Sequence, residues 1–219
     1  DPAIDVYDNA MFIIALDYLL EMAPDSPQAS RWKSLREGIE RNVRAHLWDE
    51  KRQKFIPHIY PEKSPIPEGF DELAIHYHGG TAIAIEAGLL SKDEIRTVNA
   101  QMLENVRLSG MPSIGLTLYP VYPDGFFHGG MSKAYLYQNG GDWTWFGGRM
   151  IQQLVVNGMV EEAYAEIHPM IERVIQNDGF YEWYGKGGVP SGSGNFKGSA
   201  GVLSKAIELL RDWAEKNKS

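Results

Sequence analysis

Apolar residues recur at three- and four-residue steps over much of the chain, which is the spacing of one face of an α-helix. The first such stretch covers residues 7–22 and stops before Pro24, where a helix would lose a backbone hydrogen-bond donor. The next covers residues 30–47 and sets its apolar positions in one stripe opposite Arg and Glu. The pattern predicts two consecutive helices, the second on the outside of the protein.

Glycines and caps divide the following periodic stretches. A third helix, predicted over residues 71–87, ends at Gly88, and Ser91 with Glu94 has the spacing of a capping box that opens a fourth helix to about residue 108. The short link between these helices predicts an αα-hairpin.

The same order of elements recurs in the second half of the chain. A predicted helix over residues 143–157 stops at Gly158, and a helix containing residues 160–174 follows at once. A last helix, over residues 199–216, makes seven predicted helices. A second αα-hairpin is therefore expected.

Three long segments rich in Gly, Pro and aromatic residues separate the helices, at residues 49–69, 109–141 and 177–198. Loops longer than ~15 residues in a compact chain are usually functional. Short alternating stretches at residues 54–60 and 179–184 predict small strands, but no series of strands predicts a main sheet. Helical hairpins with short turns on one side and long loops on the other predict an all-α fold, the α/α toroid, with alternating inner and outer helices.

Seven helices are fewer than a complete toroid contains. We therefore expect residues 1–219 to form a single α/α-toroid domain that is incomplete, the C-terminal part of a longer catalytic domain. Besides an oligosaccharide or glycoside substrate, the missing N-terminal half of the toroid is then one candidate partner.

Charge and composition exclude several classes of partner. The 21 Lys and Arg residues against 29 Asp and Glu residues give a net charge of -8, which argues against nucleic acid. No apolar run approaches the ~20 residues that cross a bilayer, so no membrane partner is expected. The chain has no Cys, which rules out thiolate metal sites and cysteine nucleophiles.

Aromatic residues gather in the Gly-rich loops. Trp143, Trp145, Tyr181 and Trp183 are suited either to packing or to binding amphipathic ligands such as sugars.

The segment at residues 137–145 places amides, a carboxylate and two indoles on a glycine turn before a helix. Gln138, Asn139 and Asp142 offer hydrogen bonds to sugar hydroxyls, and the glycines allow a ligand to approach the backbone. Asp142 is alternatively the N-cap of the helix that follows.

This segment resembles the Tyr-His-Asn-Gly-Gly-Ser-Trp-Pro motif of neutral and alkaline invertases. Their relatives are the glycogen-debranching glucosidases, processing α-glucosidases and trehalases, all inverting α/α-toroid glycoside hydrolases. Residues 179–184, a Gly-rich loop and residues 195–203 are similar to a second pattern of these enzymes, Glu-Tyr-Tyr followed by Phe-x-x-(Ser/Thr)-Ala. The resemblance implies that Glu182 is the general base.

A third segment, residues 6–14, resembles the (Val/Ala)-Asp-(Ser/Ala)-x-Leu-Trp-Phe-Ile segment that carries the general acid of these enzymes. It implies Asp8 as the acid, with Asp5 as the alternative. The chain departs from the pattern, because Met11-Phe12 stands in place of Leu-Trp. The other interpretation of Asp8 is an acid favoured by the dipole at a helix N-terminus.

Inverting hydrolysis of an α-glycosidic bond in an oligosaccharide or glycoside requires one carboxylic acid and one carboxylate, roughly 6.5–9.5 Å apart. The acid must stay protonated, so we expect Asp8 to be the more enclosed of the pair and Glu182 to have access to water. We also expect Trp143 or Trp145, together with Trp183, to border the principal pocket.

His76 and His78 lie two residues apart, a spacing that points them to different sides of a helix, so no metal site is expected with Asp71 or Glu72. They are predicted instead to line the sugar pocket. No cofactor is expected, because the Gly-rich run at residues 185–198 lacks a nucleotide-binding context. Two other functions fit: a sugar epimerase or isomerase that uses His76, His78 and His128, or a non-catalytic carbohydrate-binding module.

Overall fold

The computed structural model describes residues 3–218, which are almost wholly built from helices and loops. The helices are α1 (Val6–Met22), α2 (Ala29–His46), α3 (His78–Glu86), α4 (Lys92–Ser109), α5 (Thr144–Val156), α6 (Val160–Gln176) and α7 (Lys197–Lys216). Three antiparallel pairs of two-residue strands are β1 (Trp48–Asp49) with β2 (Lys54–Phe55), β3 (His76–Tyr77) with β4 (Leu118–Tyr119), and β5 (Trp183–Tyr184) with β6 (Pro190–Ser191). The predicted all-α class is confirmed.

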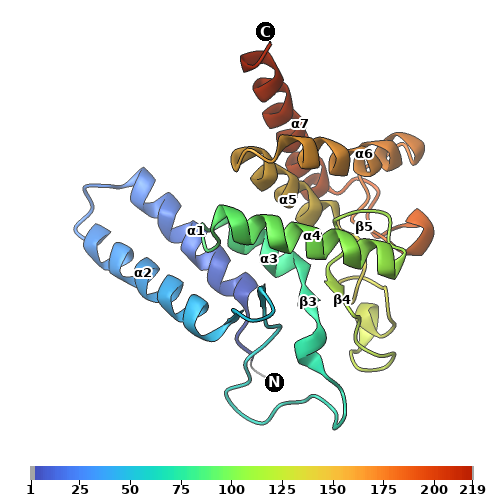
Figure 1. Ribbon diagram of the computed structural model, residues 1–219, viewed down its shortest axis with the longest axis horizontal. Helices are drawn as coiled ribbons and strands as arrows, with labels where there is room; N and C mark the ends of the chain where they lie inside the picture. The colour runs from blue at the N-terminus through green and yellow to red at the C-terminus, as the bar shows by residue number, and fades with distance from the viewer. Residues whose placement is uncertain (1–2, 219) are drawn as a thin grey trace.

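The helices form two layers (Figure 1). The inner layer is a row of neighbours in the order α1, α3, α5 and α7, and the outer helices α2, α4 and α6 pack on α1, α3 and α5. Polar contacts also join successive outer helices: Arg44 of α2 pairs with Glu94 of α4 at 2.7 Å, and Asn99 of α4 donates to Glu166 of α6 at 3.0 Å. This is the alternation of inner and outer helices expected from the sequence.

Small residues bring the inner helices close together. A Cβ atom on Gly80 of α3 would lie 2.7 Å from Val6 of α1, and one on Gly79 would lie 3.1 Å from the Phe146 ring of α5. Val6 and Ala10 of α1 are fully buried. The core therefore lies along the inner row.

The predicted hairpin turns have the expected local chemistry. Ser91 and Glu94 form both hydrogen bonds of the capping box at the start of α4. Gly88 and Gly158 adopt φ values of 73° and 77°, a left-handed conformation that glycine tolerates without strain. The helix boundaries at these turns follow the sequence prediction.

The predicted helix over residues 71–87 is wrong in its first half. Only α3, from His78, is an α-helix, and the preceding residues form a short 3-10 turn (Glu72–Ala74) and the strand β3. Two tertiary interactions explain the difference: β3 pairs with β4 of a distant loop, and the buried Lys54 ammonium donates to the carbonyls of Leu73 and Ile75 at 2.7 and 2.6 Å. Long-range pairing has overridden the local helical pattern.

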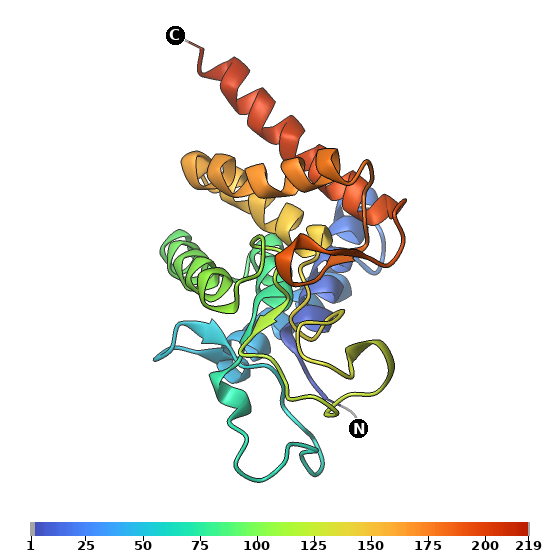
Figure 2. The ribbon, with the colours of Figure 1, turned by 90° about the vertical axis from the view of Figure 1, so that its right-hand side faces the viewer.

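The long loops gather at one end of the helices, at the N-termini of the inner row (Figure 2). Backbone pairs join them in sequence: Ile4 with Ile59, β3 with β4, and Asp142 with Tyr184. We call this the loop-bearing end, and it confirms the predicted arrangement of the loops. Within residues 3–218, no helix is long and apolar enough to cross a membrane.

Candidate functional site

Four chain segments lie at the loop-bearing end, and each of them directly precedes one of the four inner helices. They are Asp5 before α1, β3 before α3, residues 137–143 before α5, and residues 181–196 before α7. Three of the four carry a carboxylate, and all four carry aromatic or imidazole side chains within a few residues. The sequence motifs far apart in the chain are thus brought to one face of the fold.

Asp5, the alternative acid, is better enclosed than Asp8. Its carboxylate caps α1 by accepting the Asp8 backbone N–H at 2.9 Å, and its side chain lines a cavity of about 230 Å³ with His58, Tyr77 and Gln138. Burial raises the pKa of Asp5 despite that hydrogen bond. Asp8 is exposed to solvent on the first turn of α1, so the expectation that it is the more enclosed carboxyl is wrong.

A hydrogen-bonded carboxylate, that of Glu72, contacts two residues that line this cavity, His58 and Tyr122. Glu72 Oε1 accepts from the hydroxyls of Tyr60 and Tyr122 at 2.7 and 2.6 Å and lies 2.8 Å from Nδ1 of His58. Burial acts to raise the pKa of Glu72, but the hydrogen bonds from His58, Tyr122 and Tyr60 outweigh it and the pKa is lowered. Glu72 is therefore held as an anion that fixes the orientation of His58.

The sequence pattern does not indicate this cluster. It offers Glu72 only as a metal ligand, and Tyr122 lies in a loop with no recognisable pattern. One signal was present, because His58 and Tyr60 are two residues apart in a predicted strand and so project from the same side.

A second cavity, of about 620 Å³, lies on the other side of His58 and Tyr122. Its lining is largely proline and aromatic, with Phe126, Phe127 and His128 among its residues. The two cavities share His58, Tyr122 and Phe127, so a ligand that extends from one to the other would pass the Glu72 cluster.

Glu182 lies in the hairpin before α7. Its backbone N–H donates to the Ser193 carbonyl at 2.9 Å, and its Oε2 accepts from the Ser193 N–H at 3.4 Å. A Cβ on Gly192, whose φ is 71°, would lie 2.4 Å from Oε2, so this glycine leaves the space that the half-buried carboxylate occupies. The next residue, Trp183, meets Tyr137 edge to face at 6.3 Å, which places the hairpin against the segment that carries Gln138.

Asn139 and Asp142 do not face a ligand. Both are fully buried, which corrects the prediction that they bind sugar hydroxyls. The Asn139 amide exchanges hydrogen bonds with the backbone of Tyr122 at 2.9 and 3.1 Å. Asp142 pairs with Arg173 at 2.8 Å and accepts from Ser113 at 2.6 and 2.9 Å. These side chains hold the loops in place, and Asp142 makes no side-chain cap on α5.

The tryptophans divide between core and surface. Trp143 is 5% exposed and its indole N–H donates to the Tyr137 carbonyl at 3.1 Å, so it packs in the interior instead of bordering a pocket. Trp145 is half-buried under the Arg149 guanidinium, 4.5 Å from its ring centroid. Tyr181 and Trp183 are half-buried beside Glu182. Neither Trp145 nor Trp183 lines the two cavities at the loop-bearing end, so the expected tryptophan border of the pocket is not found there.

One of the two histidines, His78, differs from the prediction. His78 is buried and its Nε2 lies 2.9 Å from the amide nitrogen of Asn105, so it does not line a sugar pocket. Burial lowers the pKa of His78 to about 3 and that of half-buried His76 to about 4. Both rings are neutral near pH 7. Residues 3–218 contain no cluster of three or more His, Cys, Asp or Glu side chains that would hold a metal ion.

Comparison with known proteins shows the fold but no close relative. No protein-family model matches the chain, and no curated protein sequence matches it. Among solved structures, the GH63 mannosylglycerate hydrolase from Thermus thermophilus is similar in its complex with Tris and D-glycerate (17% identity, TM-score 0.61, covering 96% of this chain and 46% of that chain). Its complex with glucose gives 17% identity and a TM-score of 0.63, with 96% and 48% of the two chains covered.

An uncharacterized conserved protein from the same organism matches with 17% identity and a TM-score of 0.64, over 96% of this chain and 47% of that one. The chain thus spans less than half the length of these solved proteins. At this identity the likeness is one of fold, and the chain has the fold of part of an α/α toroid.

Proposed function

We propose that this chain contributes the catalytic carboxylates of a glycoside hydrolase that cleaves an α-glycosidic bond, in an oligosaccharide or glycoside, with inversion. The observation that carries the proposal is that the segments bearing Asp5, Gln138 and Glu182 each precede an inner helix at the loop-bearing end, where Asp5 and Gln138 line one cavity and Trp183 of the Glu182 hairpin contacts Tyr137. The motif resemblance and the fold shared with a GH63 mannosylglycerate hydrolase support the same reaction class.

In this proposal Asp5 is the general acid, in preference to Asp8. A general acid must hold its proton near neutral pH, and burial raises the pKa of Asp5, whereas Asp8 is exposed. Asp5 would protonate the oxygen of the leaving group. Glu182 would take a proton from the water that attacks the anomeric carbon from the opposite face.

Other side chains would bind the sugar without taking part in proton transfer. Gln138 lines the cavity beside Asp5 and offers an amide to sugar hydroxyls. The half-buried Tyr181 and Trp183 would cover the apolar face of a sugar ring next to Glu182. Trp145 and His76, both half-buried, are further candidates for contact with the sugar.

The test is release of reducing sugar from α-linked disaccharides, oligosaccharides and mannosylglycerate by the wild type and by Glu182→Gln, Asp5→Asn and Asp8→Asn. Loss of a general acid or base lowers the rate roughly 10²–10⁴-fold, which we expect for Glu182→Gln and Asp5→Asn. Glu104→Gln, an exposed substitution on α4, is the matched control. NMR of the first anomer released reports inversion or retention.

The outcomes separate the competing functions. If Asp8→Asn loses activity and Asp5→Asn does not, the acid is Asp8. Hydrolysis that survives Glu182→Gln rules out Glu182 as the base. Interconversion of sugar isomers without hydrolysis would identify an epimerase, and sugar binding by calorimetry without turnover would identify a binding module.

A further inference from the structure

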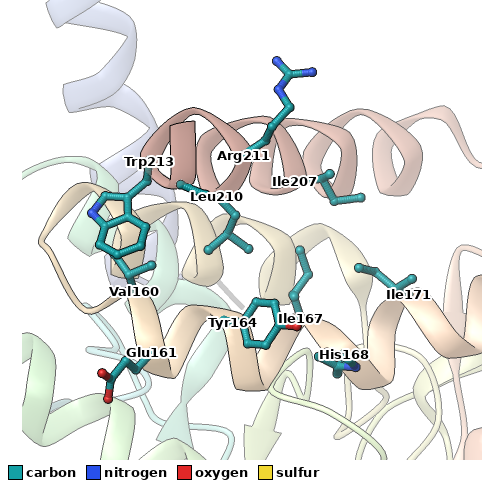
Figure 3. A pocket seen from close by; sticks show the side chains of 11 residues that line it. Val160, Glu161, Tyr164, Ile167, His168, Ile171, Ile207, Leu210, Arg211 and Trp213 are labelled. Carbon is teal, nitrogen blue, oxygen red and sulfur yellow. The ribbon is translucent and has the colours of Figure 1, made fainter. Parts of the chain in front are cut away.

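An apolar groove runs between α6 and α7 (Figure 3). Its main cavity has a volume of about 470 Å³. One face of each helix lines it: Val160, Tyr164 and Ile167 from α6, and Leu210 and Trp213 from α7. A smaller cavity of about 90 Å³ continues the groove, sharing Ile171 and Ile207 with the first. We call this surface the α6/α7 groove.

Large apolar side chains of the groove are open to solvent. Tyr164 is 61% exposed, and Ile207 and Trp213 are 43% and 44% exposed. The acidic and basic side chains in its lining are Glu161, Arg211 and the imidazole of His168. A continuous apolar surface with a polar rim is typical of a protein interaction site.

The packing order of the outer helices indicates what covers this surface. Outer helix α4 lies against α2, through the pair of Arg44 and Glu94, and against inner helix α3. Outer helix α6 lies in the same way against α4, through Asn99 and Glu166, and against α5. Each of the outer helices α4 and α6 therefore contacts the preceding outer helix and the inner helix that lies between the two in the chain. An outer helix that followed α7 in the same arrangement would contact α6 and α7, and it would lie in the α6/α7 groove.

The dimensions of the groove suit a helix. On α6 it extends from Val160 to Ile175, which is about 24 Å of helix at 1.5 Å per residue. Its lining residues are spaced three or four apart on both helices, as in grooves that accept the apolar face of an amphipathic helix.

The opposite end of the inner row is uncovered too. An inner helix with neighbours on both flanks is apolar on every side. In α1, however, Phe12, Tyr18 and Met22 are exposed, so one flank of this helix has no neighbour among the described residues. The matching solved toroids cover 96% of this chain, but the matched region is less than half of their own length.

We propose that the α6/α7 groove binds an amphipathic α-helix that takes the next outer position of the toroid and belongs to the part of the toroid absent from this 219-residue sequence. The face of that helix toward the groove is apolar at three- and four-residue steps. An acidic residue on its edge faces Arg211. The inference concerns assembly and does not depend on the proposed hydrolysis.

The test is site-specific photo-cross-linking in the cells that make the protein. Tyr164 is replaced by p-benzoylphenylalanine, a change that an exposed aromatic position accommodates, and cross-linked peptides are identified by mass spectrometry. A second label at Trp213 probes the facing helix, and a label at exposed Arg96 on α4 is the matched control. Circular dichroism of each labelled protein verifies that it is folded.

We expect labels at positions 164 and 213 to cross-link to one helical segment outside residues 1–219, within a polypeptide that supplies further toroid helices, and at least ten times more than the label at position 96. Cross-links between two copies of this chain, together with a dimer in sedimentation velocity, would overturn the proposal in favour of self-association. Labelling no stronger than that of the control would overturn it as well, because the groove would then be open to solvent.

Discussion

Asp142 and Asp5 both stand at the start of an inner helix, yet their surroundings are opposite. Asp142 is fully buried, with its oxygens engaged by Arg173 and Ser113. Asp5 is half-buried beside a cavity, and its carboxylate caps the backbone of α1. A carboxylate whose oxygens are all occupied in the interior stabilises the fold, whereas one that borders a cavity is available for chemistry. The residue type and its place before a helix do not distinguish the two roles.

The largest expected effect is that of Asp142→Ala. Removing one partner of a buried ion pair leaves the other charge without compensation, at a cost of about 3–5 kcal/mol. Arg173 would keep only its contacts with Thr144 and Ser113 and with the ring of Tyr184, 4.0 Å from its guanidinium. Urea unfolding monitored by circular dichroism measures the loss.

The matched control is Asp8→Ala, an exposed aspartate whose removal loses only a first-turn acid of α1, for which we expect a change of about 1 kcal/mol or less. Equal losses for the two variants would show that the Asp142 pair contributes no special stability, and the contrast between the two sites would fail.

A smaller effect is expected from Gly115→Ala, which tests how tightly the chain packs around Asp142. The new Cβ would lie 2.3 Å from Asp142 Oδ1 and 2.5 Å from the backbone carbonyl oxygen of Trp143. Overpacking of this kind costs about 1–3 kcal/mol. The control is Gly201→Ala on α7, where no atom lies within 4 Å of the new Cβ. Because alanine favours a helix over glycine by about 1 kcal/mol, we expect this variant to unfold at a temperature no lower than the wild type. A Gly115→Ala protein as stable as the wild type would show that the backbone around Asp142 and Trp143 shifts at little cost in free energy.

The smallest effect is expected from Asp5→Asn, and it depends on pH. Burial raises the pKa of Asp5 in the folded state above its unfolded value, so the folded protein binds the proton more tightly. Stability from this group is complete below the unfolded pKa and is lost as pH rises through the folded pKa. Asparagine keeps the cap on α1 but does not titrate. We expect the stability of the wild type relative to Asp5→Asn to fall as pH rises from 3 to 7, by about 0.5 kcal/mol or less in urea unfolding. A relative stability that rises over this range would contradict the burial of this carboxyl.

The sequence located several segments of the candidate site, but it did not predict the contacts of their side chains. The motifs around Gln138 and Glu182 identified the segments that meet at the loop-bearing end, because glycine turns before helices are local patterns. The Glu72 cluster could not be found in this way. Its members come from three separate segments, and only folding brings Tyr60 and Tyr122 to the same carboxylate oxygen.

The sequence by itself determined the seven helices, the two tight hairpins and the all-α class. These depend on interactions between neighbours in the chain, such as the capping box of Ser91 and Glu94 and the left-handed glycines 88 and 158. The tertiary structure alone decided that residues 71–77 leave the helical pattern to pair with β4, that Asp142 is buried against Arg173, and that Asp5 borders the cavity while Asp8 does not. Burial and charge pairing depend on residues that are distant in sequence, and periodicity along the chain carries no information about which of them will meet.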